Sequence, residues 1–454
     1  MRIKLQTAVK LSEIAELFVK RNFNNDADIS YVSTDTRELF PNDLFVGILG
    51  ESYDGASFTA IANSIGAYTL AVNKDATIET KSSDEILSRL IIYFKEKLTS
   101  LKCCVAITGS VGKTTAKELL CAICKHKYKT HASYMNYNNL TGLFHTVITA
   151  PDDTELLIVE MGMNSPGEIS LLSSLINPNI AVITTVGSAH VGELGSRENI
   201  ARAKLEITDG LLEGGKTVIP YGEPLLKRAK GKFTFSMSSP EADAFFIPLK
   251  LDNGGTLFDF YSHGKAVCGC RFNIPGEHIF SSMMASFAAA VLMGLSPREI
   301  SSSLQNIKPT LLRPTFLTLG THTVYDDTYS SSPEALYESM KMLTLFGKPT
   351  VAVIGDMLEL GDSSAKLHRK AGKLAAELGY KRLYLIGEHV RHTREGAIAF
   401  GIKPENIHIN KDISRLSDTL LAIDKDYGGE IILVKASHKM GLDRLIKMMK
   451  ERWT

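Results

Sequence analysis

The chain has 454 residues, of which 44% are hydrophobic and 22% are charged, and its formal net charge is +1. This composition is typical of a soluble globular protein with two to four domains. The balanced charge argues against a protein that binds nucleic acid mainly by neutralising phosphates, although a local basic patch stays open. No apolar signal segment or membrane-length apolar run is evident, so we expect a cytoplasmic location.

The first hundred residues contain two short apolar segments, 44–48 and 68–72, which predict strands of a small α/β unit. Upstream, residues 33–37 read Ser-Thr-Asp-Thr-Arg. This cluster of small hydrogen-bonding groups could hold a phosphate or a sugar, or it could be a solvated turn. The pattern alone leaves both interpretations open.

The most informative stretch begins with a buried strand at residues 103–107 and continues through a glycine-bearing turn into a helix that starts at Lys113. Gly109 and Gly112 allow backbone N–H groups to face phosphate oxygens, and the helix N-terminus adds partial positive charge. Lys113 could reach the outer phosphates, and the hydroxyl of Thr114 is placed to bind magnesium. The alternative, an ordinary glycine-rich turn, is disfavoured by Gly-Lys-Thr-Thr in this strand–turn–helix context.

Two further strands of the middle unit end in polar side chains. The segment 155–160 ends at Glu160, and an acid at this place in phosphate-loop enzymes binds or orients magnesium. The segment 180–185 leads to His190, at the end of a strand where open α/β sheets place ligands. A lone histidine is often structural, but three strand ends that converge on one edge favour a site.

Other polar residues of the middle unit have no role that their pattern decides. Asn136, Asn138 and Asn139 could form a turn through side-chain-to-backbone bonds, or they could present amides to a peptide-like ligand. Lys204 lies in a helical segment, 199–208, where a lysine is normally solvated.

The last unit alternates strands with helices, which predicts a second parallel sheet. Its expected strands are 323–327, 351–356, 382–387 and 431–434, and its expected helices are 364–378 and 416–424. We therefore predict an α/β chain of three domains. These are a small α/β N-terminal domain (1–100), a central phosphate-loop ATPase-like domain (101–312) and a doubly wound, Rossmann-like C-terminal domain (313–454).

Taken in order, these motifs make the chain resemble the Mur ligase family, the ATP-dependent amide ligases of peptidoglycan precursor synthesis. The likeness spans nearly the whole chain. The motifs that carry it are 33–37, 54–55, 109–115, 136–139, 160–163, 187–190, 195–196, 203–206, 275–278 and 326–329.

The resemblance implies an ADP-forming ligase that joins D-alanyl-D-alanine to UDP-N-acetylmuramoyl-tripeptide through an acyl phosphate. ATP and Mg²⁺ would be required, and the partners would be these small molecules, with no nucleic acid and a monomeric chain. The N-terminal domain would bind the UDP-sugar substrate and the central domain ATP. The C-terminal domain would close on the nucleotide and bind the incoming amine.

The resemblance also implies roles for individual residues. The expected catalytic residues are Lys113, His190 and Lys204, the last of which matches a lysine that is carbamylated in related ligases. The expected nucleotide-binding residues are Gly109, Ser110, Val111, Gly112, Lys113, Thr114, Thr115, His278, Arg313 and Asp327. The expected magnesium-binding residues are Thr114, Glu160, His190 and Lys204. The expected substrate-binding residues are Ser33, Thr36, Arg37, Asn136, Asn138 and Asn139.

The chain departs from the family pattern in three stretches, of which the first two fall where the adenosine or the domain junction is expected. The departures fall at Ile279, Ser282, Ser330, Ser332 and His438. They leave the phosphate-binding residues in place, so we expect catalysis to be retained. The alternatives are a related ligase for another acid and amine, a catalytically weakened paralogue, or a non-catalytic scaffold descended from a ligase.

Overall fold

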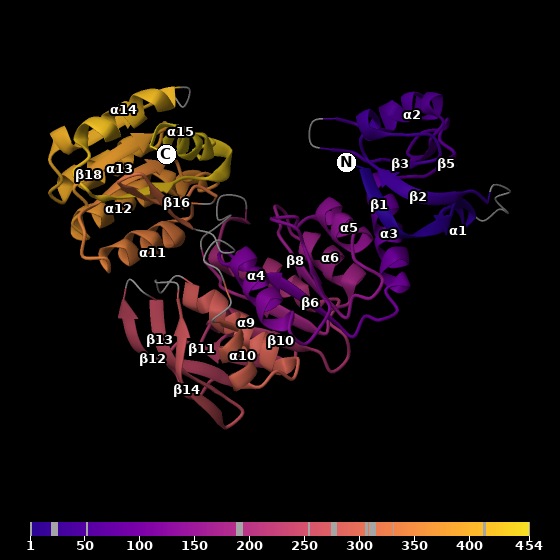
Figure 1. Ribbon diagram of the computed structural model, residues 1–454, viewed down its shortest axis with the longest axis horizontal. Helices are drawn as coiled ribbons and strands as arrows, with labels where there is room; N and C mark the ends of the chain where they lie inside the picture. The colour runs from indigo at the N-terminus through magenta and orange to yellow at the C-terminus, as the bar shows by residue number, and fades with distance from the viewer. Residues whose placement is uncertain are drawn as a thin grey trace.

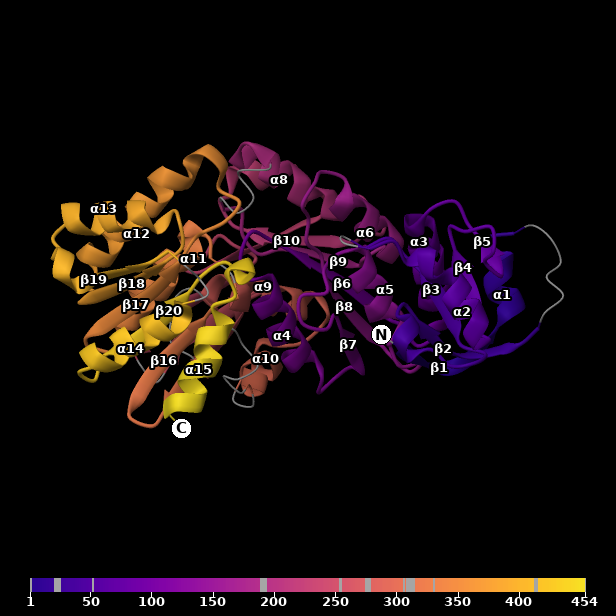
Figure 2. The same cartoon turned by 90° about the horizontal axis from the view of Figure 1, so that it is seen from above.

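The computed structural model describes residues 2–19, 26–50, 53–187, 194–252, 255–273, 279–304, 307, 315–329, 331–411 and 415–453. These residues form three β-sheets, each covered by helices, in the order N-terminal, central and C-terminal along the chain. The N-terminal and C-terminal units lie at opposite ends of the central unit (Figures 1 and 2). The predicted α/β class with three units is confirmed, whereas the predicted domain boundaries stay predictions.

The N-terminal unit is built on a five-stranded sheet of order β1-β2-β3-β4-β5. β1 is antiparallel to β2, and the remaining pairs are parallel. Its elements are β1 (Arg2–Lys10), α1 (Leu11–Glu16), β2 (Asp28–Ser33), β3 (Leu44–Gly47), α2 (Thr59–Ile65), β4 (Tyr68–Ala71), β5 (Ile78–Glu79) and α3 (Ser83–Lys97). The two strands that the sequence predicts here are β3 and β4.

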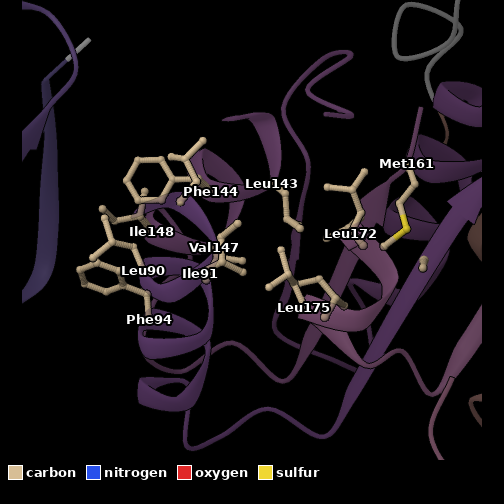
Figure 3. Packing of buried hydrophobic residues seen from close by; sticks show 14 of the residues in the cluster. Leu90, Ile91, Phe94, Leu143, Phe144, Val147, Ile148, Met161, Leu172 and Leu175 are labelled. Atoms are coloured by element: carbon tan, nitrogen blue, oxygen red, sulfur yellow. The ribbon is translucent and has the colours of Figure 1, made fainter. Parts of the chain in front are cut away.

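Helix α3 joins the N-terminal unit to the central unit. Apolar residues recur every three or four positions along it, so one face is apolar, and that face packs against α5 (Leu140–Ile148) and α6 (Glu168–Ile176). Figure 3 shows Leu90 and Phe94 of α3 facing Phe144 and Ile148 of α5. The helix that precedes the predicted boundary at residue 100 therefore shares its core with the central unit.

The central unit has a nine-stranded sheet of order β14-β13-β12-β11-β10-β9-β6-β8-β7. Its strands are β6 (Cys103–Thr108), β7 (Thr130–Ala132), β8 (Leu156–Glu160), β9 (Ile180–Ile183), β10 (Lys216–Pro220), β11 (Lys232–Ser236), β12 (Ala244–Asp252), β13 (Gly255–Ser262) and β14 (Lys265–Phe272). Besides α5 and α6, its helices are α4 (Lys113–Cys124), α8 (Arg197–Leu205), α9 (Phe280–Leu292) and α10 (Pro297–Leu304).

The strand order places the predicted polar strand ends side by side. β6 lies between β8 and β9 and is parallel to both, with Ile107 opposite Glu160 and Thr108 opposite Ile183. Because parallel strands end at the same edge of a sheet, the turn after β6 and the end of β8 meet there. The predicted convergence of these strands is confirmed.

The C-terminal unit has a six-stranded sheet of order β15-β16-β20-β17-β18-β19, antiparallel only between β15 and β16. Its strands are β15 (Thr315–Leu319), β16 (His322–Asp327), β17 (Thr350–Gly355), β18 (Arg382–Ile386), β19 (Ile407–Asn410) and β20 (Ile431–Lys435). Its helices are α11 (Pro333–Thr344), α12 (Ser364–Glu377), α13 (Val390–Ala399), α14 (Leu416–Asp426) and α15 (Asp443–Trp453). Apolar clusters cover both faces of the sheet, which confirms the predicted doubly wound arrangement.

No helix among the described residues has both the length and the apolar character that a membrane crossing requires. Cys121 and Cys124 of α4 are buried in the hydrophobic core of the central unit.

The C-terminal unit has a fully buried histidine, His368. The ring of His368 in α12 accepts a hydrogen bond from the N–H of Met357 at Nε2 (3.0 Å), and Nδ1 lies 2.9 Å from the carbonyl oxygen of Ser364. This pattern fits a neutral ring with the proton on Nδ1. Burial lowers the pKa of His368 below its usual value.

We expect the free energy of unfolding of the C-terminal unit to fall between about pH 7.5 and 5.5. The unfolded histidine titrates near pH 6.5, so as the pH drops the unfolded chain binds the proton before the folded chain does. Denaturant unfolding followed by the fluorescence of Trp453, the one tryptophan of the chain, measures this. His368→Gln should flatten the pH dependence, and an unchanged slope in that variant would contradict the assignment.

Candidate active site

The turn between β6 and α4 requires its two glycines. Gly109 has a φ of 154° and Gly112 a φ of 80°, a region of backbone conformation that disfavours side chains. A Cβ at Gly109 would lie 1.9 Å from Oγ1 of Thr184, and one at Gly112 would lie 2.2 Å from Oγ of Ser282. Both the conformation and the space therefore exclude a side chain.

The segment after β9 supports the turn through hydrogen bonds. The N–H of Ser110 donates to the carbonyl oxygen of Thr185 (3.0 Å), and the N–H of Val111 donates to the Thr185 hydroxyl (3.1 Å). The hydroxyl of Thr184 donates to the carbonyl oxygen of Val111 (2.6 Å). The turn is thus held in one conformation by its neighbouring strand.

Helix α9 supports the same turn from another side. The hydroxyl of Ser282 donates to the carbonyl oxygen of Gly112 (3.1 Å), and that of Ser281 donates to the carbonyl oxygen of Thr184 (3.0 Å). Ser282 is one of the departures from the family pattern. Its side chain here holds the phosphate-loop backbone.

Two sequence-predicted residues, Thr114 and Asn138, meet at a third, Glu160. The hydroxyl of Thr114 donates to Oε2 of Glu160 (2.7 Å), and the side-chain amide of Asn138 donates to Oε1 (3.1 Å). The Glu160 side chain is buried at the end of β8. A hydroxyl beside a carboxylate at a helix N-terminus is a set of hard oxygen donors that fits Mg²⁺. Among the described ranges no group of three His, Cys, Asp or Glu side chains could hold a metal ion.

Two lysines with lowered pKa values lie near this point. Lys113 donates from Nζ to the carbonyl oxygen of Gly109 (2.9 Å), and burial lowers its pKa while Glu160 opposes the shift. Burial also lowers the pKa of Lys204 in α8 well below the usual value, and the charge of Lys113 adds to this effect. An unprotonated amine is the form that reacts with carbon dioxide, so this environment suits a carbamate at Lys204.

A cavity of about 440 Å³ separates the phosphate loop from the C-terminal unit. Residues 110–115, Asn138 and Glu160 line one side, and Asp327 and Tyr329 are among the residues that line the other. Pockets that bind nucleotide-sized ligands have volumes in this range. The structure therefore places the predicted nucleotide-binding residue Asp327 across from the loop.

The carboxylate of Asp327 is already engaged within the C-terminal unit. It accepts hydrogen bonds at Oδ2 from Nζ of Lys435 (2.6 Å) and from the hydroxyl of Ser339 (2.5 Å). Burial raises the pKa of Asp327, and Lys435 opposes the rise. Sequence reasoning assigned no role to Lys435. The pairing became visible only through strand order, since β16 and β20 are neighbours with these two residues opposite each other.

Three other departures from the family pattern, Ile279, Ser332 and His438, line the same cavity. Ser332 accepts a hydrogen bond from the N–H of Ala335 (3.2 Å) and so caps α11. The rings of Tyr329 and His438 lie 5.3 Å apart, centroid to centroid. Ser331 is only 7% exposed, and its hydroxyl has no hydrogen-bond partner among the residues that the structure describes.

The predicted acceptor-peptide residues differ in their surroundings. Asn138 lines the cavity at the phosphate loop, and Asn136 lines a second cavity of about 590 Å³ along α4 and β7. The side-chain oxygen of Asn139 accepts from the N–H of Gly142 (2.9 Å) and caps α5. Asn139 therefore forms the turn that the sequence left open as an alternative.

The cluster at residues 33–37 forms a self-contained turn. The buried hydroxyl of Ser33 accepts from the N–H of Asp35 (3.1 Å), and the carboxylate of Asp35 pairs with the guanidinium of Arg37 (2.6 Å). Arg37 holds the pKa of Asp35 well below its usual value. Thr36 begins the short 3₁₀ turn Thr36–Glu38. The Arg37 side chain is 86% exposed, so it can contact a ligand.

Three further predicted residues lie outside the described residues, as does the departure at Ser330. They are His190, His278 and Arg313.

Comparisons with known proteins agree with this arrangement. Residues 107–290 match the family model of the Mur ligase middle domain, and residues 315–438 match the model of the Mur ligase glutamate ligase domain. UDP-N-acetylmuramoyl-tripeptide–D-alanyl-D-alanine ligase of Bacillus subtilis is 32% identical over 92% of the chain and 93% of the relative.

Solved structures show the same fold. The structure of MurF ligase from Thermotoga maritima in complex with ADP is 26% identical, with a TM-score of 0.79 over 93% of this chain and 97% of that one. MurF from Acinetobacter baumannii has a TM-score of 0.88 over 99% and 100%, at 24% identity.

Ser331→Ala should raise the KM for ATP about 2- to 10-fold, the range expected for one lost hydrogen bond to a bound ligand. Among the described residues the buried hydroxyl has no hydrogen-bond partner, so its removal should not lower the melting temperature. Steady-state kinetics and thermal unfolding measure the two effects. Thr393→Val is the matched control, because it removes another unpartnered buried hydroxyl in α13, away from the cavity. Equal KM values in the two variants would contradict a ligand contact at Ser331.

Proposed function

We propose that this chain, which belongs to the Mur ligase family, joins D-alanyl-D-alanine to UDP-N-acetylmuramoyl-tripeptide in peptidoglycan precursor synthesis. Mur ligases are ATP-dependent, ADP-forming amide ligases. The observation that carries the proposal is the meeting of Thr114 and Asn138 at Glu160. It brings the phosphate loop within reach of the turn expected to hold the acceptor peptide.

The reaction must activate a carboxylate, because a carboxylate is a poor acyl donor at neutral pH. Transfer of the γ-phosphoryl group of ATP to an oxygen of the terminal tripeptide carboxylate gives an acyl phosphate and ADP. The amine of D-alanyl-D-alanine then attacks the carbonyl carbon, phosphate leaves with the transferred oxygen, and the amine gives up a proton.

The phosphate loop supplies the positive charge for the first step. Gly109 and Gly112 allow the tight turn that aims the N-terminus of α4 at the phosphates, and Lys113 would approach the β- and γ-phosphates. When bound, Mg²⁺ would neutralise charge on the phosphates, and Thr114 and Glu160 would hold it. Lys113 would then turn from the carbonyl oxygen of Gly109 to the transferred group.

A carbamate on Lys204 would place an anion where the structure buries an amine. Burial and, as a smaller cause, the charge of Lys113 lower the pKa of this amine, and a carbamate would attract Lys113 instead of repelling it. His190, which the resemblance also places among the magnesium-binding residues, would complete the set.

The C-terminal unit would close the nucleotide site. Asp327 and Tyr329 line the far wall of the cavity, and the residues around them would exclude the water that otherwise hydrolyses an acyl phosphate. We expect Arg313 and His278 to contact the nucleotide.

The remaining assignments are proposals on the same basis. Ser33, Thr36 and Arg37 would bind the UDP end of the substrate. The three domains would span residues 1–100, 101–312 and 313–454. The chain would act in the cytoplasm as a monomer. A weakened paralogue is disfavoured because Ser282, a departure from the family pattern, keeps a hydrogen bond to the phosphate loop.

Phosphate release from ATP tests the function. We expect release only with Mg²⁺ and both substrates present, together with a product heavier by one dipeptide in mass spectrometry. Lys113→Ala should reduce turnover by at least about 10³-fold without unfolding, since it removes a charge that stabilises phosphoryl transfer. ATP binding with no release from these substrates would point instead to another acid and amine.

Lys204→Ala should lose most activity and regain part of it with added short carboxylic acids, because a free carboxylate can occupy the place of the carbamate. Carbon dioxide dependence of the unchanged chain provides an independent readout. Full activity of Lys204→Ala without additives would contradict the carbamate.

A further inference from the structure

A second cation of α4, Lys117, is buried but has no part in the chemistry described above. Its side chain is 0% exposed. Its Nζ donates to the carbonyl oxygens of Ser133 (2.5 Å) and Met135 (2.7 Å), and its charge pairs with Oε1 of Glu118 at 3.0 Å. An ammonium group has three donors, so all three are used. Burial of a charge is tolerated only with such partners.

The two carbonyl groups belong to a strained turn. Met135 has a φ of 47°, a left-handed conformation that residues other than glycine rarely adopt and that the surroundings must enforce. Lys117 draws the carbonyl groups on either side of Tyr134 to one point. One of the two carbonyl groups belongs to Met135 itself, so the contact lies directly at the left-handed residue.

The turn leads directly to Glu160. Before it, the hydroxyl of Ser133 accepts from the N–H of Glu160 (3.2 Å). After it, the carbonyl oxygen of Asn138 accepts from the N–H of Gly162 (2.8 Å), and its amide donates to the carboxylate of Glu160 (3.1 Å). The segment that Lys117 holds is therefore attached at both ends to the strand that carries Glu160.

Lys117 lies one helical turn after Lys113, so the two residues share one side of α4. The helix N-terminus faces the phosphates, and the next turn holds the asparagine segment. Lys117 itself lines neither the cavity at the phosphate loop nor the second cavity, although Ser133, Met135 and Asn136 line the latter. Its charge acts on the backbone of the turn.

We propose that Lys117 is a positioning residue that fixes the acceptor-peptide turn, residues 133–139, relative to the phosphate loop. The proposal rests on the proposed function, because the turn must bind the tripeptide end of the substrate. Lys117 determines the distance between the carboxylate to be activated and the γ-phosphate. Loss of its charge should weaken substrate binding and slow the reaction while nucleotide binding is kept.

Lys117→Met tests this proposal by keeping the length of the side chain and removing its donors. We expect the dissociation constant for UDP-N-acetylmuramoyl-tripeptide, measured by calorimetry, and its KM to rise about tenfold or more. The dissociation constant for ADP should change less than about threefold, because Lys113 and the loop glycines remain. Lys117→Gln, which keeps one donor group, should raise the same dissociation constant and KM by a smaller factor. This variant replaces Lys117→Met in the test if Lys117→Met does not fold.

Lys95→Met is the matched control. Lys95 is a half-buried lysine of α3 whose Nζ also donates to one backbone carbonyl oxygen, that of Ile176. The variant should lower the melting temperature and leave both dissociation constants unchanged. A parallel loss of ADP and UDP-substrate affinity in Lys117→Met would show a merely structural role and overturn the proposal.

Two double variants test whether Lys117 acts through the turn. Met135→Gly accepts the left-handed conformation at no steric cost, so it should restore part of the substrate affinity that Lys117→Met loses. In a chain that carries Asn138→Ala, Lys117→Met should lower the substrate affinity by less than it does in the unchanged chain, because the effects of coupled residues are not additive. Additive losses and no recovery would overturn the proposal.

The outcomes separate this proposal from the proposed function. If the unchanged chain neither binds nor turns over UDP-N-acetylmuramoyl-tripeptide, both the proposed function and the positioning role of Lys117 are wrong. If the unchanged chain is active and Lys117→Met binds the substrate equally well, only the positioning role is wrong.

Discussion

The carboxylate of Glu160 accepts hydrogen bonds from two segments that the chain brings from different directions, and the geometry of the candidate site depends on it. Thr114 comes from the helix after the phosphate loop, and Asn138 comes from the turn before α5. The strand order fixes this meeting, because β8 lies next to β6 and ends at the same edge. A carboxylate held here by neutral donors keeps its lone pairs close to the phosphate loop.

Buried and half-buried lysines are the second feature of the site, and each has its own environment. Lys113 faces the loop and Glu160, Lys117 holds two carbonyl oxygens, and Lys435 pairs with Asp327. The pKa of Lys204 is strongly lowered by burial and by Lys113. A site that binds a polyphosphate and a carboxylate needs such charges, and the protein compensates their burial with backbone carbonyl groups and acids. The net charge of +1 does not reveal this local concentration.

The sequence predicted the parts of the fold that depend on local pattern. The strand and helix on either side of the phosphate loop, β8 with Glu160, and the alternating elements of the C-terminal unit were all evident, because apolar runs and glycine positions encode them. The association of α3 with the central unit was not evident, since its apolar face does not show which partner it contacts. The pairing of Asp327 with Lys435 depends on strand order across 108 residues of chain. The burial of Lys117 was not evident either, because a helical lysine is normally solvated.

The central claim is that the tripeptide carboxylate and the γ-phosphate meet at Glu160 to form an acyl phosphate. Its most direct test is to supply UDP-N-acetylmuramoyl-tripeptide with ¹⁸O in the terminal carboxylate and to analyse the released phosphate by mass spectrometry. Because phosphate leaves with the oxygen that received it, we predict one ¹⁸O in each phosphate released with product. Phosphate without ¹⁸O, formed together with the amide product, would contradict the account.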